Sequence, residues 1–342
     1  MSAARIRARL ADVETFLPPV TRSADETEQC LRAENPDLKL PTGLIARLTG
    51  VDRVHLRPEG WQTSDLAAAA ARPVAERAGG PVDLLLFASA SQDLIEPATS
   101  HIVASKLGLD CPVMDVKNAC NSVINAMEVA TALIESGRYR RVLVASGEQP
   151  SHAVRWRLDG REQFLRSFAG YTMSDAGAAV LLEASEASEA AAAPAGVLGS
   201  RFVARSEHWQ VGTLPTGGSV NPHAVGGSYF DMDGAALQRA FARVGVGLVQ
   251  ETLDQLGIDR SELDFVAIHQ VAAAYHGTIV EALGVDVERT LLTVAEHGNL
   301  ASVTLPLQLR LALDRGLVGE GSLVALIGLA GGISLGAMVV RL

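Results

Sequence analysis

The sequence predicts an α/β fold that is built twice along the chain. Three observations point to it. Helix-like and strand-like segments alternate, the same order of segments occurs in both halves, and 48% hydrophobic residues in a chain of 342 can fill a large core. We expect largely parallel sheets with right-handed crossovers between their strands.

The N-terminal half carries the pattern in five segments. A helix-like run leads into an apolar strand, and a second strand, a long apolar helix and a third strand follow. In chain order these are residues 66–79, 82–91, 112–116, 118–137 and 140–148.

The C-terminal half repeats this order of elements. A helix is predicted at 246–258, a strand at 263–271, a strand that leads into a helix within 291–316, and a strand at 322–330. Between the halves, residues 183–196 are rich in Ala and Glu and are predicted to form a surface connection or a short exposed helix. We therefore expect one half over 1–184 and the other over 185–342.

Charge and composition disfavour several classes of function. A formal net charge of -10 argues against a broad basic face for nucleic acid or anionic lipid, and 4% aromatic residues provide few platforms for base stacking. The N-terminus has no continuous apolar segment of the signal-peptide type, and no run of about 18 apolar residues occurs. We expect a cytoplasmic protein without nucleic-acid or membrane partners.

Cys120 is the candidate nucleophile. The three cysteines, Cys30, Cys111 and Cys120, are odd in number and lack CxxC spacing, which indicates neither a disulfide framework nor a thiolate metal site. A lone cysteine is most often a small buried apolar residue. Cys120, however, stands at a predicted strand-to-helix turn, where the helix dipole and free N–H groups are expected to lower the thiol pKa.

Two polar residues of the second half support this interpretation. His269 ends a hydrophobic strand, and Asn299 opens a helix as Cys120 does. The spacing agrees, since 31 positions separate Ser89 from Cys120 and 30 separate His269 from Asn299. We therefore expect Cys120 and Asn299 at matching places near a pseudo-twofold axis. A histidine can take the thiol proton or donate to an oxyanion, and an asparagine amide can donate to the same oxygen. His297 is interpreted as structural, because the HGN turn already uses its glycine and asparagine.

The glycine-rich stretch 329–342 offers backbone N–H groups for an oxyanion hole. Gly332, Ser334 and Gly336 also match the G-x-S-x-G motif of serine hydrolases. That motif requires a helix next, whereas a β-type run follows here, so we disfavour a serine hydrolase.

The remaining motifs indicate no cofactor. The other histidines show no metal-ligand spacing, and neither a Walker A loop nor a GxGxxG placed after a strand is present. Four arginines gather within 152–170, either on a solvated loop or helix face or as an anion-docking surface. They are Arg155, Arg157, Arg161 and Arg166.

Taken together, these motifs resemble the β-ketoacyl-acyl-carrier-protein synthase III branch of the thiolase superfamily. The resemblance runs from LIARLTGVDRVHL at 44–56 to the last residue. It includes NAC at 118–120, IHQ at 268–270, HGN at 297–299 and AGGISLGA at 330–337. It implies the thiolase fold, a duplicated five-layer αβαβα arrangement with pseudo-twofold symmetry, and a homodimer.

The resemblance also implies a ping-pong mechanism. An acyl-CoA or acyl-carrier-protein thioester would acylate Cys120, with the N–H groups of Cys120 and Gly331 as the oxyanion hole. His269 and Asn299 would then stabilise the enolate formed when a malonyl-type thioester loses CO2. The enolate would attack the acyl-cysteine.

The sequence departs from the family at positions that receive the substrate. Leu44 and Leu48 replace the Trp and Arg that are common in coenzyme A binders, and Ala274 replaces a common carrier-docking Arg. Glu96 stands where relatives present a large apolar residue to a partner's acyl pocket, which suggests a polar or small acyl group.

The substrate must therefore be received in another way. The arginine cluster, with Arg155 and Arg157 foremost, is the candidate replacement for docking. Gly234 is a further candidate pocket position.

These departures favour a fatty-acid-like or polyketide specialised pathway, with decarboxylative Claisen condensation as its reaction. The alternative is acyl transfer to a hydroxyl or amine of a small molecule without C–C bond formation. Retention of Asn299 favours condensation, because ester formation does not need a donor to an enolate. A non-catalytic binding role is disfavoured by the intact Cys120, His269 and Asn299.

Overall fold

The computed structural model describes residues 6–186, 195–223 and 227–342. Two mixed sheets form its centre, one in each half of the chain. The first has the order β1-β7-β6-β4-β5 and the second the order β11-β12-β13-β8. The strands are β1 (Ile6–Phe16), β4 (Leu84–Ala88), β5 (Val113–Val116), β6 (Arg141–Glu148), β7 (Ala176–Glu186), β8 (Gly196–Ala204), β11 (Phe265–Ile268), β12 (Leu323–Ala330) and β13 (Ser334–Arg341).

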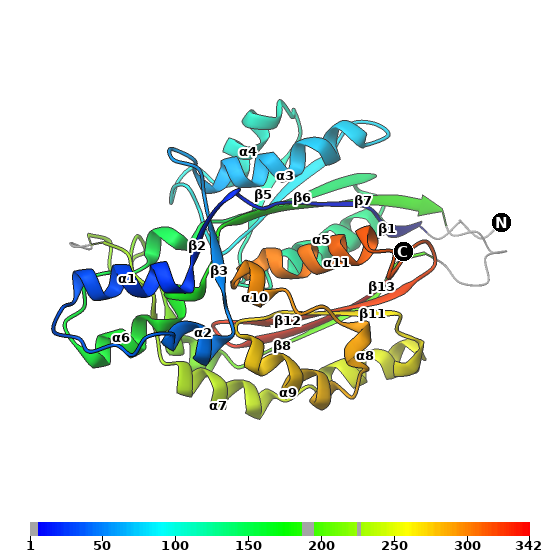
Figure 1. Cartoon of the computed structure of the whole chain (residues 1–342). Helices are drawn as coiled ribbons and strands as arrows, with labels where there is room; N and C mark the ends of the chain where they lie inside the picture. Colours follow the sequence, from blue (N-terminus) through cyan, green and yellow to red (C-terminus); the bar gives the residue numbers. More distant parts are fainter. Residues whose placement is uncertain (1–5, 187–194, 224–226) are drawn as a thin grey trace.

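Helices separate and cover the two sheets, so that the molecule has five layers (Figure 1). One outer layer lies on the first sheet, two long helices lie between the sheets, and the other outer layer lies on the second sheet. In that order the helices are α3 (Thr63–Arg77) and α4 (Thr99–Leu107), then α5 (Ser122–Glu135) and α11 (Thr304–Asp314), then α7 (Gly234–Val244), α8 (Gly247–Leu256) and α9 (Ala273–Leu283). The predicted αβαβα layering is confirmed.

The expectation of largely parallel sheets was wrong. The pairs β4–β5, β4–β6 and β11–β12 are parallel, but β7 and β13 run antiparallel to both of their neighbours. The turn between Ala330 and Ser334 is too short for a crossover helix, so β12 and β13 can pair only as a hairpin.

Two paired glycines allow α3 to lie directly on the first sheet. Gly147 of β6 and Gly177 of β7 face each other across the ladder. A Cβ at either position would lie 2.0 Å from a carbonyl oxygen of α3, that of Thr63 or of Leu66. The helix backbone therefore occupies the space that a side chain would need.

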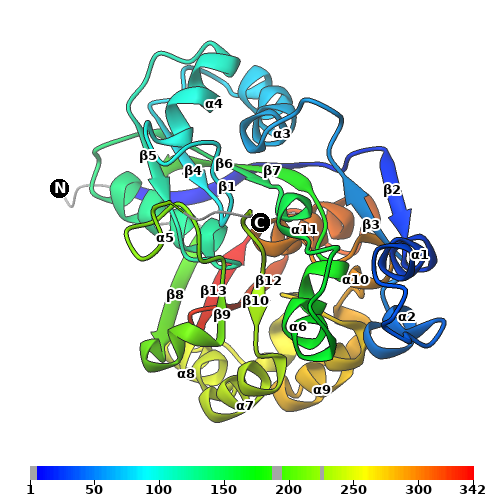
Figure 2. The ribbon, with the colours of Figure 1, turned by 90° about the vertical axis from the view of Figure 1, so that its left-hand side faces the viewer.

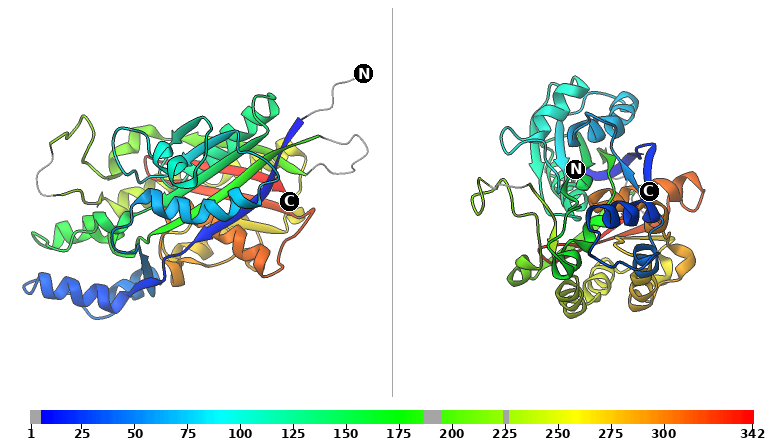
Figure 3. Two further views of the ribbon diagram at one scale, coloured as in Figure 1. Left: turned by 90° about the horizontal axis from the view of Figure 1, so that it is seen from above. Right: turned by 60° about the vertical axis from the view of Figure 1, so that its left-hand side comes forward.

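A smaller lobe extends from one end of the layers, beyond the end of β6 (Figures 2 and 3). Its apolar cluster includes Leu31, Ile45, Phe164 and Tyr171. The lobe and its connections comprise β2 (Val20–Ser23), α1 (Ala24–Glu34), α2 (Leu44–Thr49), β3 (Arg53–Leu56) and α6 (Arg161–Ser167). The remaining short elements are β9 (Gly212–Thr213), β10 (Asp231–Met232) and α10 (Val294–His297).

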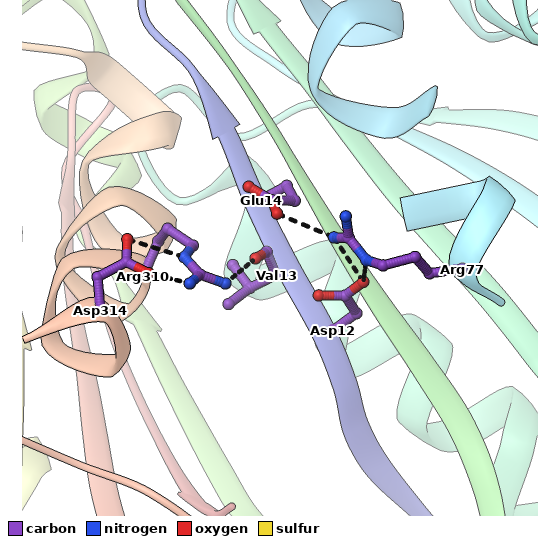
Figure 4. A network of polar contacts seen from close by, with 6 residues as sticks. All are labelled: Asp12, Val13, Glu14, Arg77, Arg310 and Asp314. Atoms are coloured by element: carbon purple, nitrogen blue, oxygen red, sulfur yellow. Dashed lines mark hydrogen bonds and ion pairs between the residues drawn. The ribbon is translucent and has the colours of Figure 1, made fainter. Parts of the chain in front are cut away.

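Arginines of α3 and α11 form polar contacts with β1 from its two sides (Figure 4). Arg77 of α3 pairs with Asp12 at 2.8 Å and with Glu14 at 2.9 Å. Arg310 of α11 donates to the Val13 carbonyl at 3.4 Å and also pairs with Asp314. These contacts are partly exposed and add little stability individually, but they fix α3 and α11 against the same strand.

The two halves match in a register that differs from the predicted one. Ala119 and Ala301 both have a positive φ, 45° and 49°, and each lies three residues before its helix, α5 or α11. The counterpart of Cys120 is therefore Ser302, and the predicted match with Asn299 was wrong. Asn299 follows the short helix α10, because residues 290–293 form no strand equivalent to β5.

Most of the predicted connection at 183–196 lies outside the described residues, and the boundary between 184 and 185 stays a prediction. β7 extends to Glu186, and β8 begins at Gly196. None of the helices that the structure describes combines the length and the apolar character that crossing a bilayer requires.

Candidate active site

A strained turn presents Cys120. Ala119 adopts φ 45°, a conformation that costs a non-glycine residue energy and persists only where its surroundings enforce it. The Ser122 hydroxyl enforces it here, accepting from Asn118 N–H at 2.9 Å and donating to the Ala119 carbonyl at 2.7 Å. Asn121 anchors the same turn to the second half of the chain, donating to Ser334 Oγ at 2.9 Å.

Protein atoms enclose the Cys120 sulfur, although the residue as a whole is partly exposed. This burial, with the negative charge of Glu148, raises the pKa of the thiol to about 12. The backbone N–H groups of Cys120 and Gly331 lower that pKa, but less than burial raises it. The expected lowering of the thiol pKa was therefore wrong, because desolvation outweighs the helix-start donors. The oxyanion hole of the Cys120 and Gly331 N–H groups stays a prediction.

His269 lies at the end of β11 and is 2% exposed. Its backbone N–H donates to Ile327 of the neighbouring β12 at 2.9 Å. Neither ring nitrogen has a hydrogen-bond partner among the described residues, and burial lowers the pKa of the imidazole to about 4. The ring is therefore neutral at ordinary pH and keeps one free donor and one free acceptor.

Asn299 is held by its backbone. Its N–H donates to the Thr172 carbonyl at 2.8 Å, and its own carbonyl accepts from Ser174 at 3.0 Å. Gly298 is required beside it, since a Cβ there would lie 2.7 Å from Thr172 O. The side-chain oxygen accepts from Ala301 N–H at 3.0 Å. Among the described residues the amide nitrogen of Asn299 has no partner, so its two N–H groups remain free.

The fold gathers the predicted residues at one end of the two sheets. His269 and Gly331 follow the adjacent parallel strands β11 and β12, and the Gly331 N–H lowers the pKa of the Cys120 thiol. Ser302, three residues after Asn299, bonds at 2.5 Å to Glu148, whose charge acts on the same sulfur.

Sequence reasoning missed Glu148. It is 1% exposed at the end of β6, and burial raises the pKa of its carboxyl. A carboxylate that ends a continuous apolar strand run was the available signal, the same signal that identified His269.

His297 packs against His55. The rings are stacked with centroids 5.3 Å apart, and His297 Nδ1 lies 3.0 Å from His55 Nε2. Burial lowers the pKa of both imidazoles. The pair joins β3 to α10, immediately before the Asn299 turn.

The arginine cluster divides into two parts. Arg155, Arg161 and Arg166 line a cavity of about 770 Å³ beside α6, which none of Cys120, His269 and Asn299 lines. The Arg155 guanidinium lies 4.3 Å from the Tyr229 ring centre, and Arg166 pairs with Asp231. Arg157 instead lies outside this cavity, exposed and paired with Glu34 at 2.8 Å.

Two other predicted positions lie apart from the thiol. Glu96 is exposed in the segment between β4 and α4, beside the exposed side chains of Leu94 and Ile95. Gly234 begins α7, with no atom within 4 Å of the place of a Cβ.

Two family models match the chain. Residues 114–200 match 3-oxoacyl-[acyl-carrier-protein] synthase III, and residues 253–342 match the C-terminal part of the same family. A curated relative, β-ketoacyl-[acyl-carrier-protein] synthase III of Neisseria meningitidis, is 28% identical over 340 residues, which is 98% of this chain and 99% of the relative.

Solved structures resemble the whole chain. OleA of Xanthomonas campestris, in a cysteine-to-serine variant with bound lauric acid and lauroyl-CoA, superimposes with a TM-score of 0.83 at 25% identity. The alignment covers 98% of this chain and 99% of that one. FabH, the 3-oxoacyl-(acyl carrier protein) synthase III of Pseudomonas aeruginosa PAO1, gives 0.82 at 25% identity over 98% of both chains.

Proposed function

This chain belongs to the 3-oxoacyl-[acyl-carrier-protein] synthase III branch of the thiolase superfamily, a family of enzymes that condense acyl thioesters. On that premise we propose that it forms an acyl-enzyme on Cys120. We further propose that it joins this acyl group to a malonyl-type thioester in a decarboxylative Claisen condensation.

One observation carries the proposal. His269 and Asn299 both have side-chain donors that no group of the described protein accepts. Burying the His269 nitrogens without partners costs about 1–3 kcal/mol each, so their position is explained best by a ligand oxygen that needs a donor. The free amide N–H groups of Asn299 can donate to the same oxygen. The enolate oxygen of a decarboxylated malonyl thioester is such an acceptor.

The first step is acyl transfer to sulfur. Cys120 and His269 are both neutral at rest, so the thiol loses its proton only as its sulfur attacks the acyl carbon. We assign His269 to accept that proton and pass it to the departing thiolate of the carrier. During the attack the N–H groups of Cys120 and Gly331 donate to the carbonyl oxygen as its negative charge develops. This step forms one C–S bond and breaks another.

The second step uses the free donors. The bond between the malonyl carboxylate and the α-carbon breaks, CO2 leaves, and the electron pair forms an enolate. His269 and Asn299 donate to its oxygen. The α-carbon then attacks the acyl group, forming a C–C bond and breaking the C–S bond. The Cys120 sulfur leaves as a thiolate and takes up a proton from solvent.

For substrate docking we propose the cavity beside α6. Neither Arg155 nor Arg161 takes part in an ion pair within the described residues, so both are available to a phosphate of a pantetheine-bearing carrier. Arg157, already paired with Glu34, contributes less. Glu96 and the exposed Leu94 and Ile95 would face a second subunit in the homodimer that the resemblance implies.

The test is Asn299→Ala. The acyl-loaded variant is incubated with malonyl thioester that carries a labelled carboxylate, and released CO2 is counted. We expect normal loading of Cys120 and a decarboxylation rate lower by about 10²–10³-fold. Normal CO2 release with lost loading would reverse the assigned roles. Discharge of the acyl group only by an added alcohol or amine, without CO2, would favour the alternative acyltransferase.

A further inference from the structure

Gln308 of α11 binds the strand residue that directly precedes His269. The Ile268 N–H donates to Gln308 Oε1 at 2.9 Å, and Gln308 Nε2 donates to the Ile268 carbonyl at 2.7 Å. Gln308 is 0% exposed, and Ile268 is the last residue of β11. A buried amide of the inner helix layer therefore fixes the end of β11 at which His269 lies.

The fold leaves this position without a second neighbouring strand. β11 is the edge strand of its sheet, and His269 donates its N–H to Ile327 of β12, the neighbour on its paired side. Successive residues of a parallel strand direct their backbone groups alternately to the two sides, so those of Ile268 face the free edge. β4, the equivalent strand of the first half, has β5 on the corresponding side, whereas the described part of the second half contains no such strand. The Gln308 amide supplies the donor and the acceptor that a strand would supply.

Gln270 makes a second tie on the other side of His269. Its side-chain oxygen accepts from the N–H groups of Thr293 and Val294 at 2.9 and 3.0 Å, and the residue is 3% exposed. These two residues lead into α10 and the Asn299 turn, and α11 follows that turn. The chain on both sides of His269 is therefore bound to the chain on both sides of Asn299.

The His269 ring depends on these backbone ties for its direction. Among the described residues neither ring nitrogen has a hydrogen-bond partner. A catalytic histidine is commonly oriented by a hydrogen bond to one ring nitrogen, which leaves the other nitrogen for the substrate. No such bond forms within the described part of the chain, so the ring is held through its backbone and by the packing of its neighbours.

We propose that Gln308 is a positioning residue. Its amide fixes the end of β11 relative to α11, so that the His269 ring and the Asn299 amide meet the same ligand oxygen. The inference rests on the proposed function for the identity of that oxygen. The direction of the His269 ring does not, and it can be measured without substrate.

The first measurement is nuclear magnetic resonance of the full chain with its histidines isotopically labelled at Cε1. The His269 signal is identified by its loss in His269→Leu. Gln308→Met removes both bonds to Ile268 but keeps a flexible side chain of similar volume. We expect the His269 signal to shift by more than its line width or to split, while the signal of the exposed His101 stays in place.

The second measurement is CO2 release from labelled malonyl thioester by the acyl-loaded enzyme. We expect Gln308→Met to lower kcat by about 10–100-fold and to change KM by less than about twofold, because a misplaced donor weakens the transition state more than it weakens substrate binding. In a His269→Leu background the same replacement should lower kcat by less than about twofold, since no ring is left to misplace. A general loss of stability would lower the rate equally in both backgrounds.

The matched control is Arg310→Met on the same helix. The polar contacts of Arg310 go to Asp314 and to the Val13 carbonyl, and not to β11, so neither measurement should change. If Gln308→Met does not fold, Gln308→Asn is one methylene shorter and should loosen the same tie, with smaller changes in the same direction.

A folded Gln308 variant whose His269 signal stays at its wild-type position would overturn the proposal. Equal losses of CO2 release with and without His269 would overturn it too. If the wild type releases no CO2, the proposed condensation fails, whereas a displaced His269 signal would still support the placement of the ring by Gln308.

Discussion

At the scale of single residues, the candidate site is a set of polar groups whose burial is not compensated inside the protein. In the part of the chain that the structure describes, no cation acts on the enclosed Cys120 sulfur, and neither ring nitrogen of His269 has a hydrogen-bond partner. Hydrogen-bonded groups surround them, and Asn299 is fixed by bonds from its backbone on both sides. The folded protein is therefore less stable than it would be with apolar residues at this site. Such a cost is expected where a binding site is preorganised for its ligand.

The first residue-scale prediction separates function from stability. His269→Leu removes the two unpartnered nitrogens, so we expect the melting temperature to stay the same or rise while decarboxylation falls by about 10²–10³-fold. Calorimetry and CO2 release measure the two effects.

The control is His276→Leu. His276 is also buried, but its Nε2 lies 3.0 Å from the Thr290 hydroxyl, so this replacement breaks a bond and should lower the melting temperature. Destabilisation of His269→Leu to the same degree would show that the His269 nitrogens have partners after all.

The residues of the site could be named from sequence, but their electrostatics could not. The ends of strands indicated Cys120 and His269 as candidates, whereas the spacing that indicated Asn299 matched it with Cys120 in the wrong register. The direction of the Cys120 pKa depends on how completely neighbours from both halves enclose the sulfur. That enclosure, and the approach of Glu148 from β6, arise only in the folded chain.

At the scale of elements, close contact between helix and sheet backbones is a main determinant of the fold. Gly177→Ala would place a methyl group 2.0 Å from the Leu66 carbonyl of α3. We expect the free energy of unfolding, measured by urea denaturation, to fall by about 1–3 kcal/mol or more. Neither the helix backbone nor the strand backbone can move without disrupting its own hydrogen bonds. Gly319→Ala, where no atom lies within 4 Å of the new Cβ, should change stability by less than about 0.5 kcal/mol. Equal effects of the two replacements would contradict the described packing.

The His55–His297 pair predicts acid sensitivity at the contact of β3 with α10. Burial lowers both pKa values below the ordinary 6.5. Below about pH 6.5 the unfolded chain therefore binds more protons than the folded chain does. The stability that the neutral pair contributes is complete above that pH and is lost as the pH falls through the folded-state values.

When the pH is lowered from about 7.5 to about 5, the free energy of unfolding of His297→Gln should therefore fall less than that of the wild type. Urea denaturation at the two pH values measures this difference. The exposed His101 of α4 supplies the control, since His101→Gln should keep the wild-type pH dependence. An unchanged pH dependence in His297→Gln would refute the assignment.

Sequence patterns predicted most elements but not how the two halves differ. The segments at 82–91, 118–137 and 322–330 contain β4, α5 and β12. The missing equivalent of β5 in the second half escaped notice, because LLTV at 291–294 is as apolar as a strand. Only the positive φ angles of Ala119 and Ala301 reveal that Ser302, rather than Asn299, is the counterpart of Cys120.

At the scale of the whole molecule, duplication places two helix-opening turns between two sheets. The core shared by the sheets includes apolar residues of α5 and α11 together with strands of both halves, so neither half can bury its inner helix alone. One turn presents a nucleophile, and the other presents a serine that supports the Asn299 turn through Glu148. Because the equivalent positions carry different residues, Cys120 and Ser302, the repeated fold has one candidate active site and not two.

The most direct test of this account is intact-protein mass spectrometry of the wild type and of Cys120→Ala after incubation with a panel of acyl thioesters, followed by malonyl thioester. The account predicts a mass gain of one acyl group on Cys120, absent from Cys120→Ala, that is discharged with release of CO2. A gain on Cys30 or Cys111, or a Cys120 adduct that malonyl thioester leaves in place, would contradict it.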